Sequence, residues 1–174
     1  MSLAAADTPF FPHVTVAALI EQEGRFLLVE ERQKGRLVLN NPAGHLDPGE
    51  SLVQACVREV LEETAHDFTP TALVGVYLSR YIGDDAPAIG SPTFVRFAFC
   101  GTLGAHHPDR VLDSPITQCL WLSPDEMRQQ ADRLRSPSVW QGVQDYLCGR
   151  RLPLEALHTH ASVYGGAGTG LPRA

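Results

Sequence analysis

The first fifty residues alternate between apolar runs and short polar turns. Residues 13–20, HVTVAALI, form a mostly continuous apolar run rich in β-branched residues, which is typical of a buried strand. Residues 25–30, RFLLVE, form a second run, and the short polar spacer at 21–24 predicts a hairpin. A polar turn follows at 33–36, and the turn-forming residues of 40–49, NNPAGHLDPG, predict a shaped loop.

The hydrophobic period changes after this loop and predicts a helix from about Ser51 to Thr64. Ser51 and Gln54 have the spacing of a capping box, in which each side chain bonds the other residue's backbone N–H. The side chains that recur at helical spacing are Val53, Cys56, Val57, Val60 and Thr64.

The remainder of the chain predicts three strands, at 73–79, 93–101 and 118–122. It also predicts two helices, one beginning at Ser123-Pro124 and one running from Ser136 or Pro137 to Leu147. Loops are expected at 83–92 and 104–115, and the Gly-rich tail at 165–174 is expected to be peripheral. This order predicts an α/β fold with helices against the faces of a sheet. The absence of repeats predicts a single domain over 1–174, with its core at about 10–148.

Charge and composition narrow the class of partner. The chain has 174 residues, of which 44% are hydrophobic and 20% charged, as in a globular protein. Its formal net charge of -6 argues against nucleic acid or an anionic membrane surface as partner. Two short basic spots, at 128–135 and 149–151, have the appearance of ordinary solvated faces.

Cysteine usage and hydropathy predict a cytoplasmic location. The four cysteines form no C-x-x-C pair, and their apolar neighbours predict small core residues in a reducing compartment. No apolar stretch approaches the roughly 18 residues that a membrane span needs. The N-terminus has no positive segment followed by an apolar core, so no signal peptide is expected.

The predicted helix carries three glutamates on one face. Glu59, Glu62 and Glu63 are spaced i, i+3 and i+4 and fall within an arc of about 100°. Carboxylates so close repel one another unless a cation lies between them. Hard oxygen ligands select Mg²⁺, or Mn²⁺ as a substitute, and such a metal neutralises phosphate oxygens and acidifies a bound water.

Three neighbouring residues fit the same hypothesis. Gly44 lies in the loop before the helix, where a backbone carbonyl can complete the coordination of a metal. Arg58 cannot lose its proton, and it can pair with Glu50 or Glu62 to hold the acidic cluster in shape. The alternative reading is a solvated surface helix, for which a triplet of glutamates is common.

The segment from Gly44 to His66 resembles the Nudix box: Gly44, five residues, Glu50, seven residues, then Arg58-Glu59-Val60-Leu61-Glu62-Glu63. Two positions depart from that pattern, because Ala65 replaces a glycine and His66 replaces an apolar residue. The glycine normally ends the helix in a left-handed conformation. We therefore expect Ala65 to end the helix differently, or the helix to run on slightly.

Further stretches resemble the NudJ phosphatase subgroup of this family, and the resemblance reaches to about residue 148. The resemblance implies a Nudix-type α/β/α sandwich with a mixed β-sheet. It implies that Glu59 and Glu63 bind Mg²⁺, that Glu62 belongs to the cluster, and that a carboxylate acts as general base. These stretches are 12–17 (PHVTVA), 40–46 (NNPAGHL), 94–97 (FVRF) and 134–137 (LRSP).

The resemblance also implies an activity. It predicts hydrolysis of nucleoside di- and triphosphates, and of the diphosphate of the thiamin pyrimidine precursor, with release of phosphate. The same fold with ADP-ribose or dinucleoside polyphosphates as substrate is one alternative, and a non-catalytic nucleotide-binding domain is another. A monomer and a homodimer are both compatible with the sequence.

Substrate contacts are expected at Arg96 and Glu50, with Glu62, Glu63 and Arg58 as the candidate catalytic residues. Arg96 lies in the middle of an apolar strand, where a charge is costly without a partner. A substrate phosphate would suit its planar guanidinium, and a structural salt bridge is the alternative. Four aromatic residues could stack on a base, although aromatic side chains are more often core: Phe10, Phe11, Tyr81 and Trp140.

Overall fold

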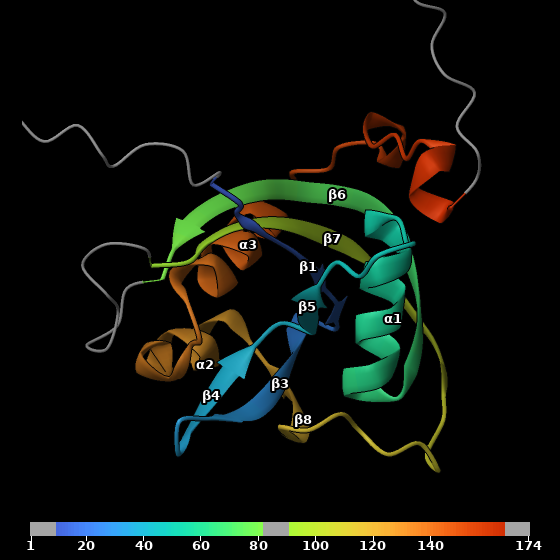
Figure 1. Cartoon of the computed structure of the whole chain (residues 1–174). Coiled ribbons are helices and arrows are strands. Elements are labelled where there is room, and N and C mark those ends of the chain that lie inside the picture. The colour runs from blue at the N-terminus through green and yellow to red at the C-terminus, as the bar shows by residue number, and fades with distance from the viewer. Residues whose placement is uncertain (1–9, 82–90, 166–174) are drawn as a thin grey trace, which may run out of the picture.

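The computed structural model describes residues 10–81 and 91–165, and its strands form two sheets (Figure 1). In the first sheet β1 and β7 are parallel and the other pairs antiparallel, so the sheet is mixed. Its order is β5 (Ala43–His45), β1 (His13–Leu19), β7 (Thr93–His106) and β6 (His66–Arg80). The second sheet is antiparallel and contains β2 (Glu21–Gln22), β3 (Arg25–Gln33), β4 (Arg36–Asn40) and β8 (Ile116–Leu122).

Helices cover both faces of the mixed sheet, with α1 on one side and α3 on the other (Figure 1). The side chains of β1 alternate between the two faces, as a strand requires. Val16 and Ala18 pack in one apolar cluster with Val60 of α1. Ala17 and Leu19 pack in a second cluster with the residues of α3. The helices are α1 (Leu52–Thr64), α2 (Pro124–Gln129) and α3 (Pro137–Leu147), with 3₁₀ turns at Ala131–Arg133, Leu154–Ala156 and Ala161–Tyr164.

This arrangement confirms the expected α/β/α sandwich, but several strands are longer or more numerous than predicted. The turn expected at 33–36 is present at Lys34-Gly35. β4 includes residues 37–39, for which no element was predicted, β5 lies within the loop expected at 40–49, and β7 continues through His106 into the second predicted loop. β6 begins at His66, directly after the helix, because it pairs with β7 along its whole length. Register shifts in this pair accommodate Pro70 and Gly75, and they break the alternation that would have revealed the strand. The loop expected at 83–92 lies mostly outside the described residues, as does nearly all of the Gly-rich tail.

Helix α1 begins as predicted. The Ser51 hydroxyl accepts a hydrogen bond from the Gln54 N–H at 3.1 Å, and the Gln54 side chain accepts one from the Ser51 N–H at 2.9 Å. Both bonds of a capping box are therefore present. Because the capping box fixes the first residue of the helix, it also fixes which face of the helix carries Glu59, Glu62 and Glu63.

The prediction about the end of this helix is wrong. Ala65 has φ 55° and ψ 27°, which is the left-handed conformation that a glycine would adopt. Its N–H bonds the Leu61 carbonyl at 3.0 Å, and its own carbonyl accepts from the His107 N–H at 2.8 Å. The Asp113 N–H likewise bonds the Glu62 carbonyl at 3.0 Å. The loop after β7 thus satisfies carbonyls at the end of α1 and holds Ala65 in a conformation that alanine disfavours.

Restoring the glycine should stabilise the protein. We expect Ala65→Gly to raise the free energy of unfolding by about 1 kcal/mol, or the melting temperature by about 2–4 °C, because glycine adopts a positive φ without a steric penalty. Thermal unfolding followed by circular dichroism measures the change. Ala55→Gly, inside the same helix, should lower stability instead. A melting temperature that falls in both variants would contradict this account of the cap.

The exposure of the cysteines and the length of the helices test two further expectations. Cys56 and Cys100 are buried as predicted, and Cys119 is partly buried. Cys148 is exposed, so its prediction as a core residue is wrong; it follows the last turn of α3, where the apolar face of the helix has ended. None of the helices in the described ranges is long and apolar enough to cross a membrane.

Candidate active site

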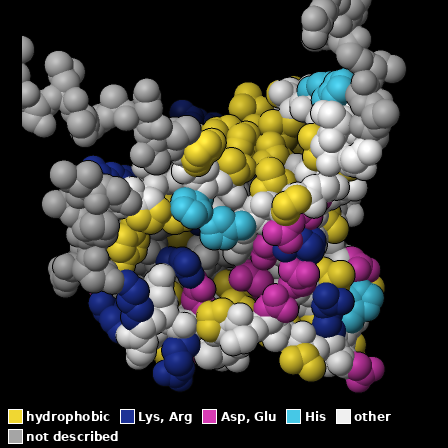
Figure 2. Space-filling model, viewed as in Figure 1, with side chains coloured by type: hydrophobic (Ala, Val, Ile, Leu, Met, Phe, Trp, Pro, Cys, Tyr) yellow, Lys and Arg dark blue, Asp and Glu magenta, His cyan; other side chains and the backbone are white. Residues whose placement is uncertain are grey.

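Arg58 is the centre of a network on the acidic face of α1. Its Nη1 donates to Glu59 Oε1 at 2.7 Å and to Glu62 Oε2 at 3.0 Å. Its Nε and Nη2 donate to the two oxygens of Glu50, at 3.1 and 2.8 Å. Nη2 also donates to the His45 carbonyl at 2.9 Å. One guanidinium therefore connects the loop before the helix with two carboxylates of the helix, and Figure 2 shows the acidic side chains gathered beside α1.

The same network distinguishes the carboxylates electrostatically. Hydrogen bonds from Arg58 hold the pKa of Glu50 below its ordinary value. Burial raises the pKa of Glu59, although the hydrogen bond from Arg58 opposes the shift. Glu50 has both oxygens engaged, because Oε1 also accepts from the Asp47 N–H at 2.8 Å. Glu50 therefore holds Arg58 and the loop before α1 in position.

Replacing Arg58 tests this network. We expect Arg58→Lys to lower turnover about 10-fold, since an ammonium keeps the charge but cannot donate along the fork directions to Glu50, Glu59 and Glu62 together. Steady-state kinetics at saturating Mg²⁺ measures the change. Arg151→Lys is the matched control, because Arg151 lies outside the acidic cluster, where it donates to backbone carbonyls and stacks on the Tyr146 ring. Wild-type turnover in Arg58→Lys would show that the charge of Arg58 alone suffices.

Gly44 lies against the carboxylate of Glu59. A Cβ added to Gly44 would be 2.1 Å from Glu59 Oε1 and 2.2 Å from its Cδ, closer than any real contact. The absence of a side chain at Gly44 therefore creates the space that Glu59 occupies. This places the β5 backbone directly beside the acidic face of the helix.

Glu63 lies deeper than the other two carboxylates. Its Oε2 accepts a hydrogen bond from the Ala43 N–H at 2.8 Å. Burial raises the pKa of Glu63 to about 8, and the nearby charges of Glu59 and Glu31 contribute to the shift, whereas the Ala43 hydrogen bond opposes it. A carboxyl group with this pKa can hold or release a proton near neutral pH.

The three helix glutamates do not converge as a ready-made ligand set. Within residues 10–81 and 91–165, no three carboxylate, imidazole or thiolate side chains are arranged to hold a metal ion. Glu59 and Glu62 turn an oxygen towards Arg58, and Glu63 turns one towards Ala43. The Arg58 guanidinium places its positive charge beside Glu59 and Glu62. Each of these hydrogen bonds uses one oxygen of its carboxylate, and rotation about side-chain bonds can turn the second oxygen towards a metal. The donor set contains only oxygen atoms, which fits a hard dication.

Arg96 is partly buried, and two asparagines hold its guanidinium in place of a carboxylate. Its guanidinium donates to Asn40 Oδ1 at 3.3 and 3.4 Å and to Asn41 Oδ1 at 3.1 Å, and it forms no ion pair within the described ranges. The predicted structural salt bridge is therefore absent there. Burial lowers the pKa of Arg96 to about 10, which shows the cost of a cation without a carboxylate partner at this position.

The basic spot at 128–135 is not an ordinary solvated face. Arg133 forms an ion pair with Glu30, and Arg135 forms one with Glu31 at 2.5 Å. Both glutamates lie on β3 and are buried. The sequence analysis missed these glutamates, although two adjacent acidic residues at the end of an apolar strand were a visible signal.

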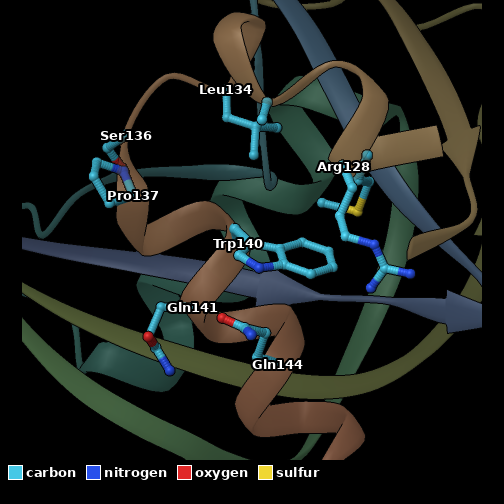
Figure 3. A pocket seen from close by; sticks show the side chains of 9 residues that line it. Arg128, Leu134, Ser136, Pro137, Trp140, Gln141 and Gln144 are labelled. Atoms are coloured by element: carbon cyan, nitrogen blue, oxygen red, sulfur yellow. The ribbon is translucent and has the colours of Figure 1, made fainter. Parts of the chain in front are cut away.

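The aromatic candidates lie in different places. Phe10 and Phe11 are exposed, and Tyr81 lies under the ammonium of Lys34. Trp140 lines a cavity of about 650 Å³ together with Leu134, and the Arg128 guanidinium is 5.4 Å from the Trp140 ring centroid (Figure 3). This cavity lies between α2 and α3 and includes none of the acidic residues of α1.

Comparison with known proteins identifies the family. The model of the NUDIX domain matches residues 10–140. The chain therefore belongs to the Nudix hydrolase family, whose members act on phosphorus-containing acid anhydrides and generally use divalent metals.

Individual relatives agree with this assignment. The chain is 40% identical over 148 residues to Phosphatase NudJ of Escherichia coli K12, covering 85% of this chain and 92% of that protein. Phosphatase NudJ of Shigella flexneri gives the same values. A solved NUDIX hydrolase from Nitrosomonas europaea superposes with a TM-score of 0.79 and 46% identity, covering 86% of this chain and 98% of the other. An ADP-ribose pyrophosphatase from Streptococcus suis, at 21% identity and a TM-score of 0.57, shares the fold.

Proposed function

We propose that this chain is a Mg²⁺-dependent Nudix hydrolase that cleaves the diphosphate bond of nucleoside di- and triphosphates or of small pyrophosphorylated metabolites. The observation that carries the proposal is the position of Glu63, a partly buried carboxyl group that accepts a hydrogen bond from the Ala43 N–H and whose pKa burial and the charge of Glu59 raise to about 8. The identity to the NudJ phosphatases supports release of inorganic phosphate, and it makes the diphosphate of the thiamin pyrimidine precursor a substrate to test.

The residues that would hold the metal are Glu59, Glu62 and Glu63, with the backbone carbonyl of Gly44. A bound Mg²⁺ supplies two things: charge that neutralises phosphate oxygens, and a water of lowered pKa. Mn²⁺ has similar ligand preferences and is expected to substitute for it.

The side chains of the chain itself have separate roles in this proposal. Glu63 accepts the proton of the attacking water, and Glu62 is the alternative base. Arg58 is a positioning residue that sets the geometry of the carboxylates, and Glu50 fixes Arg58. Arg96 binds a substrate phosphate, which would give its partly buried guanidinium the anionic partner that it lacks among residues 10–81 and 91–165.

A screen of phosphorylated metabolites with Mg²⁺ and product identification tests the proposal. We expect hydrolysis of nucleoside di- and triphosphates or of a pyrophosphorylated metabolite, with inorganic phosphate as product. Release of nucleoside monophosphate from ADP-ribose or dinucleoside polyphosphates would favour the other substrate classes. Tight nucleotide binding by calorimetry without hydrolysis of any compound would replace the proposal with a binding function.

A further inference from the structure

Arg135 reaches the same region as Arg96 from a different part of the chain. Its backbone N–H bonds the Leu39 carbonyl at 2.9 Å, which fixes the segment after α2 beside β4. The next residue of β4 is Asn40, whose side chain holds the Arg96 guanidinium. After burial, the charge of Arg135 is the largest influence that lowers the pKa of Arg96, so the two cations lie within electrostatic reach.

Both arginines also act on Glu63. The charge of Arg135 lowers the pKa of Glu63 against the larger effect of burial, and the charge of Glu63 raises the pKa of Arg96 against the effect of burial. The two guanidinium groups therefore lie near the deepest carboxylate of the candidate metal site. Like charges brought together in a buried region are unfavourable unless an anion joins them.

The groups that hold these arginines have unsatisfied polar atoms. Glu31, whose side chain is 6% exposed, uses Oε2 for Arg135, and its buried Oε1 has no hydrogen-bond partner in the described structure. Asn41 uses Oδ1 for Arg96, and its buried Nδ2 has no partner among the same residues. Native proteins rarely leave such atoms unpaired, and of these two atoms only Asn41 Nδ2 is a donor that can pair with an anion. Glu31 neutralises one of the two guanidinium groups, so a net positive charge and the unpaired Asn41 amide donor remain to bind an anion.

We propose that Arg96 and Arg135 together form a subsite for the phosphoryl group of the substrate that is not attacked, with Glu31 and the Asn40–Asn41 pair holding the two guanidinium groups in place. The subsite rests on the proposed function, because its ligand is the second phosphoryl group of a diphosphate whose first lies at the acidic face of α1. Both guanidinium forks can donate to phosphate oxygens, and Asn41 Nδ2 adds a further donor. The side chain of Arg135 is 39% exposed and can admit the ligand.

Arg133 provides a matched control. It lies two residues before Arg135 and forms the same kind of ion pair with the buried Glu30, the residue that precedes Glu31 on β3. The charge of Arg133 helps to lower the pKa of Glu30 but is not among the influences on Arg96 or Glu63. A purely structural ion pair should respond alike at the two positions, whereas a phosphate subsite should respond only at Arg135.

The test is calorimetric titration with α,β-methylene-ADP, a non-hydrolysable diphosphate, in the presence of Mg²⁺. We expect Arg135→Gln to weaken binding about 10-fold or more, the order for losing a charge-assisted contact, and Arg133→Gln to change it less than about 2-fold. In turnover assays Arg135→Gln should raise KM while kcat changes little, because the subsite binds ground state and transition state alike. Unchanged binding in Arg135→Gln, or equal weakening in Arg133→Gln, would overturn the subsite.

A second variant controls for loss of stability, because Arg135→Gln leaves the buried Glu31 carboxylate without its ion-pair partner. The double variant Glu31→Gln with Arg135→Gln removes that charge, and binding should remain weak in it; recovery of wild-type affinity would assign the effect to Glu31 alone and end the proposal. The two proposals fail separately. A wild-type protein that binds the analogue but hydrolyses nothing contradicts the proposed function, whereas an active protein indifferent to Arg135→Gln contradicts the subsite.

Discussion

Replacing Glu63 with glutamine is expected to lower Mg²⁺-dependent turnover by about 100-fold or more, the order for losing a group that accepts a proton or holds a metal. Glutamine has the same shape, and its carbonyl can still accept from the Ala43 N–H, so the fold should persist. Initial rates at saturating Mg²⁺ measure the loss. Glu155→Gln, in an exposed 3₁₀ turn far along the chain from the acidic cluster, should keep wild-type turnover. A fully active Glu63→Gln variant would remove Glu63 from the mechanism.

The same substitution should have the opposite effect on metal-free stability. The pKa of Glu63 in the folded protein is about 8, against an ordinary value of 4.5. The folded state therefore holds this proton more tightly than the unfolded chain, and the free energy of unfolding falls as the pH rises from about 4.5 to about 8. Glutamine has no such proton, so Glu63→Gln should escape this loss.

Melting temperatures in EDTA at several pH values reveal this difference. Near pH 5 the variant and the wild type should melt together, and above pH 8 the variant should melt about 4–8 °C higher, which corresponds to roughly 2 kcal/mol. A gap that does not widen with pH would mean that Glu63 is not protonated in the metal-free protein. Adding Mg²⁺ should narrow the gap, because the cation stabilises the carboxylate that only the wild type has.

The sequence predicted the parts of the site that depend on local spacing. The positions of the three glutamates and of the capping box follow from the period of one helix alone, because all of these residues lie within or next to that helix. Arg96 was recognised from its apolar neighbours, but its partners were not, since Asn40 is 56 residues away and on another sheet. The Arg135–Glu31 pair was missed for the same reason. Ala65 shows the reverse case, in which hydrogen bonds from the loop after β7 impose a conformation that local preference opposes.

Gly44 is the position where a single added methyl group should most disturb the candidate active site. The Cβ of alanine would lie 2.1 Å from Glu59 Oε1, and the neighbouring backbone is held by β1, so the Glu59 carboxylate must move. A displacement of about 1 Å in such a group commonly costs about 100-fold in rate, and we expect that loss of turnover in Gly44→Ala together with weaker Mg²⁺ binding. Turnover and a Mg²⁺ titration of thermal stability measure both effects.

Gly35→Ala separates this steric effect from ordinary backbone strain. Gly35 has φ +81° and no atom within 4 Å of its added Cβ, so alanine there should lower stability by about 1 kcal/mol and leave the turnover of the folded protein unchanged. Gly44→Ala should show the reverse, a large loss of turnover with a smaller loss of stability, because Glu59 is partly exposed and can swing towards solvent. If the two variants lost turnover equally, the close approach of Gly44 to Glu59 would have no catalytic meaning, and the β5 backbone would have to be removed from the proposed metal site.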